Sequence, residues 1–288
     1  MPKLVYDNKS LSPFGFLRSA IFVTKEYIHR RPDRNYSPAF LANGKSEEAS
    51  RYLETLERDG IVVIPGYFKG GQLATLQELF DKVVAGKPTP GVENSLSEAN
   101  GCGAGMPILQ AALDDMLLQI IGGYYKKEFG LGRGNAVRLM PTPPKRSESY
   151  QWHHDTRGRQ IHGMILLNDV TPQGQRMSYL KGSHNVYYDR FRGESHGSRF
   201  ENDVAKVGSI SGEVAELAGP AGTVGLFDSN GLHSGNRNDK EKRDCLLFCY
   251  VSHPRHFKEV SIRREELMQL PDYKRKLVEM NPRLTITD

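Results

Sequence analysis

The sequence has 288 residues, of which 38% are hydrophobic and 25% charged, enough for a buried core in one large domain or two small ones. No apolar run approaches the ~20 residues of a membrane-spanning helix, and no signal-peptide pattern is present, so we expect neither an integral membrane protein nor an exported one. The three cysteines (Cys102, Cys245 and Cys249) form no C-x-x-C pattern, which indicates a reducing compartment and predicts a cytoplasmic location.

The charge balance is mildly basic, with 39 Lys and Arg against 34 Asp and Glu and a net charge of +5. Such an excess is compatible with nucleic acid, an acidic membrane surface or an anionic small molecule, and equally with an ordinary solvated surface. No block of five basic residues and no compact nucleic-acid-binding motif occurs in the sequence. We therefore expect no nucleic-acid partner.

Residues 1–46 differ in composition from the rest and are predicted to be an N-terminal extension. Within them, apolar and basic side chains alternate from Phe14 to Arg31 in a way that a basic amphipathic helix would explain. Such a helix over residues 14–31 could make peripheral contact with an anionic membrane surface. The favoured alternative is that it packs on its own domain and closes one end of it.

Residues 47–288 are predicted to form a single domain that begins with helices. Helical spacing of apolar residues predicts helices over 47–58, from 73 to about 86, and over 108–129. The apolar run 61–64 lies between turn signals, and its β-branched content predicts a buried strand.

After Gly134 the pattern changes to short apolar or alternating runs separated by turn residues. The runs are 135–140, 149–155, 162–167, 177–180, 223–227 and 245–251. This spacing predicts a β-sandwich or barrel with its core at about 134–253. The polar segment 185–219 is predicted to be lid-like, and the charged residues 254–288 to form a C-terminal helical cap.

The most informative motif is Trp152-His153-His154-Asp155. On a strand, His153 and Asp155 point to the same face, and a second histidine, for which His233 is the candidate, would complete a facial triad of the kind that binds Fe(II) in non-haem oxygenases. The simpler alternatives are a chance His-x-Asp, a structural His233, and an Asp155 that orients His153 or pairs with a nearby arginine.

Four ordered blocks, at 59–68, 152–155, 166–184 and 221–238, together resemble the phytanoyl-CoA dioxygenase family of Fe(II)/2-oxoglutarate-dependent oxygenases. The resemblance extends from Arg58 to Val251, about two thirds of the chain. One departure is Lys181, which stands where the family usually has proline.

The resemblance implies a mainly β fold with a double-stranded β-helix (jelly roll) core and flanking helices. It also implies that Fe(II) is held by His153, Asp155 and His233, with 2-oxoglutarate as cosubstrate and O2 as oxidant. Arg243 then corresponds to the arginine that binds the distal carboxylate of 2-oxoglutarate, a role that suits its bidentate geometry. Further candidates for the cosubstrate site are Ser234 and Arg138, with Arg237 as an alternative to Arg243.

The reaction implied is hydroxylation of a C–H bond with release of succinate and CO2. Asp155 occupies the position where related halogenases have a small residue, so halogenation is not expected. Cationic residues near the motif favour a small anionic substrate, although several could simply pair with surface carboxylates. The candidate substrate contacts are Arg157, Arg159, Tyr187 and Tyr188.

Three other histidines, His162, His184 and His196, are not nominated as ligands, and the face that His162 occupies is left open. Alternative functions are a non-catalytic jelly-roll binding protein, a membrane-associated adaptor, and an oxygenase that acts on a lipid or sugar head group at a membrane surface. A nucleic-acid demethylase ranks last, because no base-recognition motif supports it.

Overall fold

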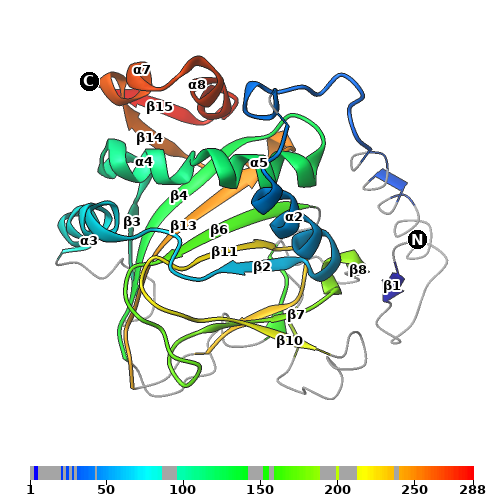
Figure 1. The fold of residues 1–288 in the computed structure, drawn as a ribbon, viewed down its shortest axis with the longest axis horizontal. Helices are drawn as coiled ribbons and strands as arrows, with labels where there is room; N and C mark the ends of the chain where they lie inside the picture. Colours follow the sequence, from blue (N-terminus) through cyan, green and yellow to red (C-terminus); the bar gives the residue numbers. More distant parts are fainter. Residues whose placement is uncertain are drawn as a thin grey trace.

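Two antiparallel sheets packed face to face form the β-rich core, and helices cover the outer face of one of them (Figure 1). The computed structural model describes residues 3–5, 21, 24–25, 28, 31–42, 44–85, 96–141, 152–155, 159–188, 199–200, 213–236 and 240–288. The predicted fold, mainly β with flanking helices and a jelly-roll core, is confirmed.

The larger sheet has six strands. In spatial order they are β2 (Ile61–Ile64), β11 (Val224–Asp228), β6 (Gln160–Leu166), β13 (Arg243–Val251), β4 (Gly130–Leu139) and β3 (Leu96–Asn100). The smaller sheet has five, in the order β10 (Val214–Leu217), β7 (Met177–Leu180), β12 (His233–Gly235), β5 (Trp152–His153) and β9 (Arg199–Phe200). Because β4 to β7 and β11 to β13 alternate between the sheets, the chain winds as a double-stranded β-helix.

The sheets take strands from outside the predicted β-core. β2 and β3 precede residue 134 and form the two edges of the six-stranded sheet. The segment 185–219, predicted to be lid-like, contributes β9 and β10 to the five-stranded sheet. It also contains β8 (Val186–Tyr188), which pairs in parallel with β1 (Lys3–Val5). Much of the remaining segment lies outside the described residues.

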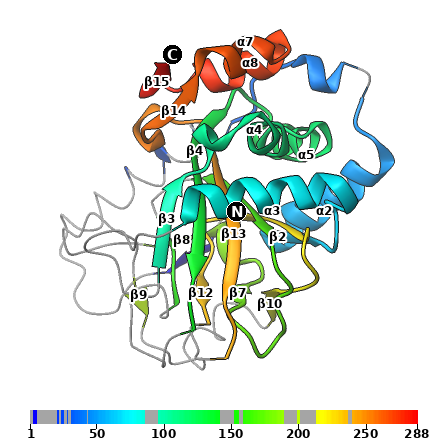
Figure 2. The same ribbon diagram turned by 90° about the vertical axis from the view of Figure 1, so that its left-hand side faces the viewer.

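Four α-helices lie along the outer face of the six-stranded sheet (Figures 1 and 2). They are α2 (Glu47–Asp59), α3 (Gly70–Val84), α4 (Met106–Ala112) and α5 (Asp115–Tyr125). The single helix predicted over 108–129 is wrong, because the chain breaks into α4 and α5. Asp114 has extended backbone, and its carboxylate accepts hydrogen bonds from the backbone N–H groups of Met116 and Leu117, so it starts a new helix.

Each side of the six-stranded sheet has its own apolar core. On the helix side, Leu246 and Phe248 of β13 pack with side chains of α2 to α5. On the other side, Cys245 of β13 packs with Tyr179 and Phe227 inside the barrel. Because successive side chains of a strand point to opposite faces of the sheet, only every second residue can reach a site inside the barrel.

The C-terminal residues combine short helices and strands, rather than the helical cap predicted for 254–288. They comprise a 3-10 turn (Pro254–His256), β14 (Val260–Arg263), α7 (Arg264–Gln269), α8 (Asp272–Glu279) and β15 (Leu284–Thr287). β14 and β15 pair in parallel, and Ile262 and Val278 are buried in the helix-side core. This region is thus packed into the same core as the helices (Figure 2).

Of the predicted amphipathic helix at 14–31, only five residues are described. Ile21 and Ile28 among them are 46% and 56% exposed. Phe40, further along, packs edge-on against Phe129 with ring centroids 6.1 Å apart, which attaches this part of the extension to the core. Within the described part of the chain, no helix has both the length and the apolar character to cross a bilayer. Peripheral membrane contact remains a prediction.

Candidate active site

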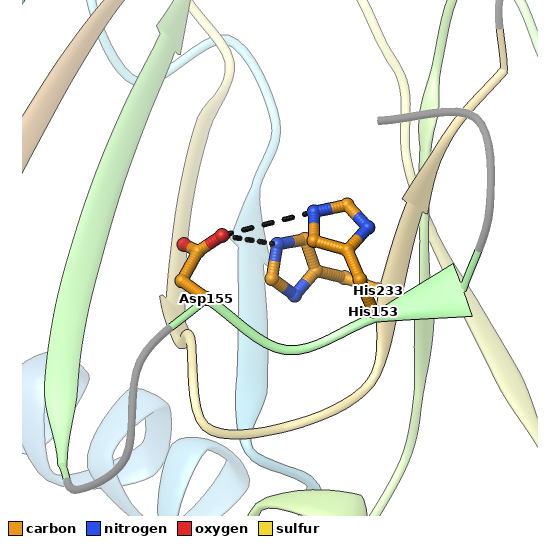
Figure 3. A group of neighbouring side chains, drawn as sticks. All are labelled: His153, Asp155 and His233. Carbon is orange, nitrogen blue, oxygen red and sulfur yellow. Dashed lines mark ion pairs between the residues drawn. The ribbon is translucent and has the colours of Figure 1, made fainter. Parts of the chain in front are cut away.

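Two neighbouring strands of the five-stranded sheet bring the two predicted histidine ligands together. His153 of β5 and His233 of β12 are direct cross-strand partners, with ring centroids 4.3 Å apart. Asp155 follows two residues after His153, and its backbone N–H donates to the carbonyl oxygen of Ser229 at 3.1 Å. That bond attaches the Asp155 backbone to the turn that precedes His233, so the three side chains converge (Figure 3).

The donor atoms of the three residues fit a metal ion. Oδ1 of Asp155 lies 3.7 Å from Nε2 of His153 and 3.5 Å from Nε2 of His233. One ligand atom from each residue falls within a group whose members are all within 4.8 Å of one another. Two imidazoles and one carboxylate on one face are the donor set of mononuclear non-haem Fe(II) sites, which leaves positions for further ligands.

The turn before His233 fixes the orientation of its ring. Nδ1 of His233 lies 3.0 Å from the carbonyl oxygen of Gly231, to which the N–H donates, so Nε2 remains available to a metal. The Tyr179 ring stacks on His233 at 6.5 Å, and its hydroxyl donates to the carbonyl oxygen of Asp228 at 2.8 Å. A Cβ at Gly231 would overlap that hydroxyl, so glycine is required here.

The electrostatics of the group favour an ionised carboxylate. Burial alone would raise the pKa of Asp155, but the charge and hydrogen bond of His233, with smaller contributions from His162 and His153, lower it below its usual range. Burial acts to lower the pKa of His233, but the charge and hydrogen bond of Asp155, together with the Gly231 carbonyl and the charge of Asp228, raise it. The site therefore offers a negative charge to a cation.

Arg243 lies at the start of β13, where strand alternation directs it into the barrel with Cys245. Its side chain is buried, and one terminal nitrogen donates to the carbonyl oxygen of Gln175 at 2.8 Å. Nε is also buried but has no hydrogen-bond partner, and no carboxylate among the described residues pairs with the guanidinium. A buried donor without a partner is costly, so this position fits a bound carboxylate such as that of 2-oxoglutarate.

Two further candidates for the cosubstrate site face away from the barrel interior. Ser234 follows His233 on β12 and therefore points to the opposite face, in register with Ser178, whose hydroxyl donates to Glu216. Arg138 faces the helices, where it donates to Asp244 at 2.7 and 2.9 Å and to Asp81 at 2.6 Å. Both residues are close in sequence to residues of the site, but their side chains do not enter the barrel interior. The structure therefore does not support Ser234 or Arg138 as contacts of the cosubstrate.

The predicted substrate contacts are not gathered at the triad either. Arg159 has Nε 3.8 Å from Asp228 and stacks over the Tyr124 ring at 4.3 Å, on the helix side of the sheet. There it lines a separate pocket of about 280 Å³ together with residues of α2 and α5. Arg157 lies outside the described residues, as do Arg237 and the side chains of Tyr187 and Tyr188, whose backbone forms part of β8.

A row of inward-facing residues, which the sequence does not predict as a row, crosses the six-stranded sheet beside the triad. Arg133, Cys249, His162 and Phe227 are aligned on four adjacent strands, β4, β13, β6 and β11. Nδ1 of His162 lies 3.6 Å from Oδ2 of Asp155. The alternation of side chains shows which residues of one strand share a face. Only the pairing between strands shows that these four residues lie in one row across the sheet.

Solved structures share this fold. The epimerase SnoN, in complex with Fe3+, alpha ketoglutarate and nogalamycin RO, superimposes with a TM-score of 0.57 at 17% identity, covering 72% of this chain and 84% of SnoN. EctD from S. alaskensis, with 2-oxoglutarate and 5-hydroxyectoine, gives a TM-score of 0.55 at 19% identity, with 77% and 86% covered.

The His-Asp-His ligand set, the fold and the similarity to a curated relative support an Fe(II)/2-oxoglutarate-dependent oxygenase. The relatives that the chain matches are oxygenases of the phytanoyl-CoA dioxygenase-like type, in agreement with the resemblance noted in the sequence. A curated relative is ectoine dioxygenase of Stutzerimonas stutzeri (strain A1501). It is 25% identical over 234 residues, which are 71% of this chain and 77% of the relative. No family model matches the chain.

Proposed function

We propose that this protein hydroxylates a C–H bond of a small anionic molecule, using Fe(II), 2-oxoglutarate and O2. One oxygen atom enters the substrate as a hydroxyl group, and the other enters succinate as 2-oxoglutarate loses CO2. The observation that carries the proposal is the convergence of His153, Asp155 and His233 on one point inside the barrel. Asp155 retains the carboxylate, so hydroxylation is favoured over halogenation.

The roles of the residues follow from their positions. His153, Asp155 and His233 would hold the iron, which supplies the activation of O2 when 2-oxoglutarate is bound. Arg243 would bind the distal carboxylate of 2-oxoglutarate through the N–H that has no protein partner. Apolar side chains of the barrel core, among them Phe227 and Leu247, would limit the access of water to the reacting atoms.

The anionic character of the substrate is supported by Arg133 more than by Arg159. Arg133 faces the barrel interior on β4, in the same row as His162. Two strand spacings, about 10 Å, separate their backbones, a distance that an arginine side chain and a small substrate can span together. Ectoine, which carries a carboxylate, is the first compound to test, because a curated relative is an ectoine dioxygenase.

The test begins with anaerobic addition of Fe(II) and 2-oxoglutarate to the purified protein. The expected result is a weak visible metal-to-ligand charge-transfer band, absent in His153→Ala and Asp155→Ala. Turnover is then followed as succinate release in air with ectoine and with a panel of small carboxylates and phosphates. A folded wild-type protein that gives no band would instead support the non-catalytic binding protein.

The cellular location is part of the same proposal. All three cysteines are buried and none forms a disulfide bond, which suits a reducing compartment such as the cytoplasm.

An oxygenase that acts on a lipid or sugar head group at a membrane surface is the second candidate function. The exposed Ile21 and Ile28 beside Lys25 are the observation that favours it.

A further inference from the structure

His162 is a buried histidine beside the triad that none of the roles above uses. It lies on the inner face of β6, and its side chain is only 14% exposed. The ring packs edge-on against Phe227 at 5.3 Å. On the adjacent strand, its cross-strand partner Cys249 donates from Sγ to Oε1 of Gln160, so the surroundings of the ring are ordered by packing and hydrogen bonding.

The two oxygens of Asp155 face different partners. Oδ1 is the atom near Nε2 of both ligand histidines, at 3.7 and 3.5 Å. Oδ2 is the atom near Nδ1 of His162, at 3.6 Å. One oxygen is thus directed to the metal position, and the other to a ring nitrogen on the opposite sheet.

We propose that His162 is a positioning residue, which holds Oδ2 of Asp155 through its Nδ1–H so that Asp155 offers only Oδ1 to the metal. The inference rests on the proposed iron site and extends it by a residue outside the ligand set. The separation between Nδ1 of His162 and Oδ2 of Asp155 is longer than a hydrogen bond, and a shift of roughly half an ångström would bring the two atoms within hydrogen-bonding distance.

A carboxylate held in this way binds a metal through one oxygen and leaves the other positions of the ion to the cosubstrate and O2. Without His162, Asp155 is free to rotate and to present both oxygens. Residues that orient metal ligands typically contribute 10- to 100-fold to metal affinity. We expect a loss of this size, together with a change in the geometry of the bound ion.

The test compares His162→Asn with His162→Leu in the full-length apoprotein. Asparagine and leucine have nearly the same shape, but only asparagine places an N–H close to the position of Nδ1. Each protein is titrated anaerobically with Co(II), and both the dissociation constant and the visible absorption bands of the bound ion are recorded. Met164→Leu, on the same strand and face, is the packing control.

We expect His162→Leu to bind Co(II) 10- to 100-fold more weakly with an altered spectrum, and His162→Asn to resemble the wild type. If His162→Leu does not fold, His162→Gln replaces it, because its amide lies further from the backbone and does not reproduce Nδ1. Equal affinities and identical spectra in the wild type and the variant lacking the donor would overturn the role of His162. A wild type that binds no Co(II) would instead overturn the metal site itself.

Discussion

Arg138 and Arg243 lie on adjacent strands, one residue out of register, and their guanidinium groups occupy opposite faces of the same sheet. Arg138 is the cross-strand partner of Asp244, whereas Arg243 is the partner of Leu139. The first arginine therefore meets Asp244 and Asp81 under the helices. The second enters the barrel, where Gln175 supplies only a backbone carbonyl.

Replacing Arg243 should weaken the binding of 2-oxoglutarate. Charge-assisted hydrogen bonds to a carboxylate contribute about 1.5–3 kcal/mol, so Arg243→Gln should raise the dissociation constant roughly 10- to 100-fold. Arg243→Lys should recover part of the loss, because it keeps the charge without the fork geometry. Titration of the charge-transfer band with 2-oxoglutarate measures the effect, and unchanged affinity in both variants would contradict this assignment.

Replacing Arg138 should affect stability instead. Asp244 is buried, and Arg138→Met leaves it with Lys242, which donates at 2.6 Å. Loss of one partner of a buried carboxylate should lower the free energy of unfolding by about 1–3 kcal/mol, since one cation remains. Urea denaturation measures this change. The affinity for 2-oxoglutarate should stay at the wild-type value, and a large loss would return Arg138 to the cosubstrate site.

Replacing Arg133 should affect the substrate. For a substrate with a carboxylate or phosphate, Arg133→Gln should raise KM by about 10-fold or more, because a charge-assisted contact is lost. Arg133→Lys should show a smaller effect. Steady-state succinate release with ectoine, or with whichever carboxylate or phosphate compound the panel identifies, gives the two values. The affinities for Co(II) and for 2-oxoglutarate are the controls and should not change.

Gly222 and Gly182 form a matched pair for backbone strain. Both have positive φ, at +84° and +75° respectively. A Cβ at Gly222 would overlap the carbonyl oxygen of Phe68, whereas a Cβ at Gly182 meets nothing within 4 Å. Gly182→Ala should cost about 1–2 kcal/mol of unfolding free energy from φ alone. Gly222→Ala should cost at least about 3 kcal/mol, and equal melting temperatures for the two variants would refute the difference.

The buried thiols should be unreactive in the folded protein. Burial raises the pKa of Cys102 and of Cys249 to about 12, which keeps both protonated at neutral and mildly alkaline pH. Because Cys245 is buried as well, a thiol reagent at pH 8 should modify none of the three cysteines until a denaturant is added. Rapid reaction of any of them in the native protein, followed by mass spectrometry, would show that the core around that cysteine opens.

The sequence predicted the residues of the site better than their faces. His153, Asp155 and His233 were recognisable because the motif spacing is characteristic, and Ile61–Ile64 because a β-branched run between turns has few alternatives. β5 and β12 have only two and three residues, too short for a periodic pattern to show which way Ser234 points. Alternation shows which residues of a strand share a face, but not which of the two faces points into the barrel. That is fixed only when the strand pairs with its neighbours, and pairing depends on residues far away in the sequence.

The same limit explains the other differences. The break between α4 and α5 depends on Asp114, which caps the N-terminus of α5. The 3.6-residue apolar pattern continues through this position, so the pattern alone does not predict the break. The sequence does not give the face that His162 occupies, because that face depends on how β6 pairs with its neighbouring strands. Its pairing with both Cys249 and Phe227 turns it towards Asp155.

The pairing of β5 with β12 consists of a single matched position, His153 opposite His233. An ion bound by both imidazoles would therefore tie together two distant parts of the chain at the point where the hydrogen-bonded ladder is shortest. Because the unfolded chain does not hold these ligands together, the ion would stabilise the folded state by its free energy of binding. Chelation should then loosen the pairing of β5 with β12 and leave the helix-backed sheet intact.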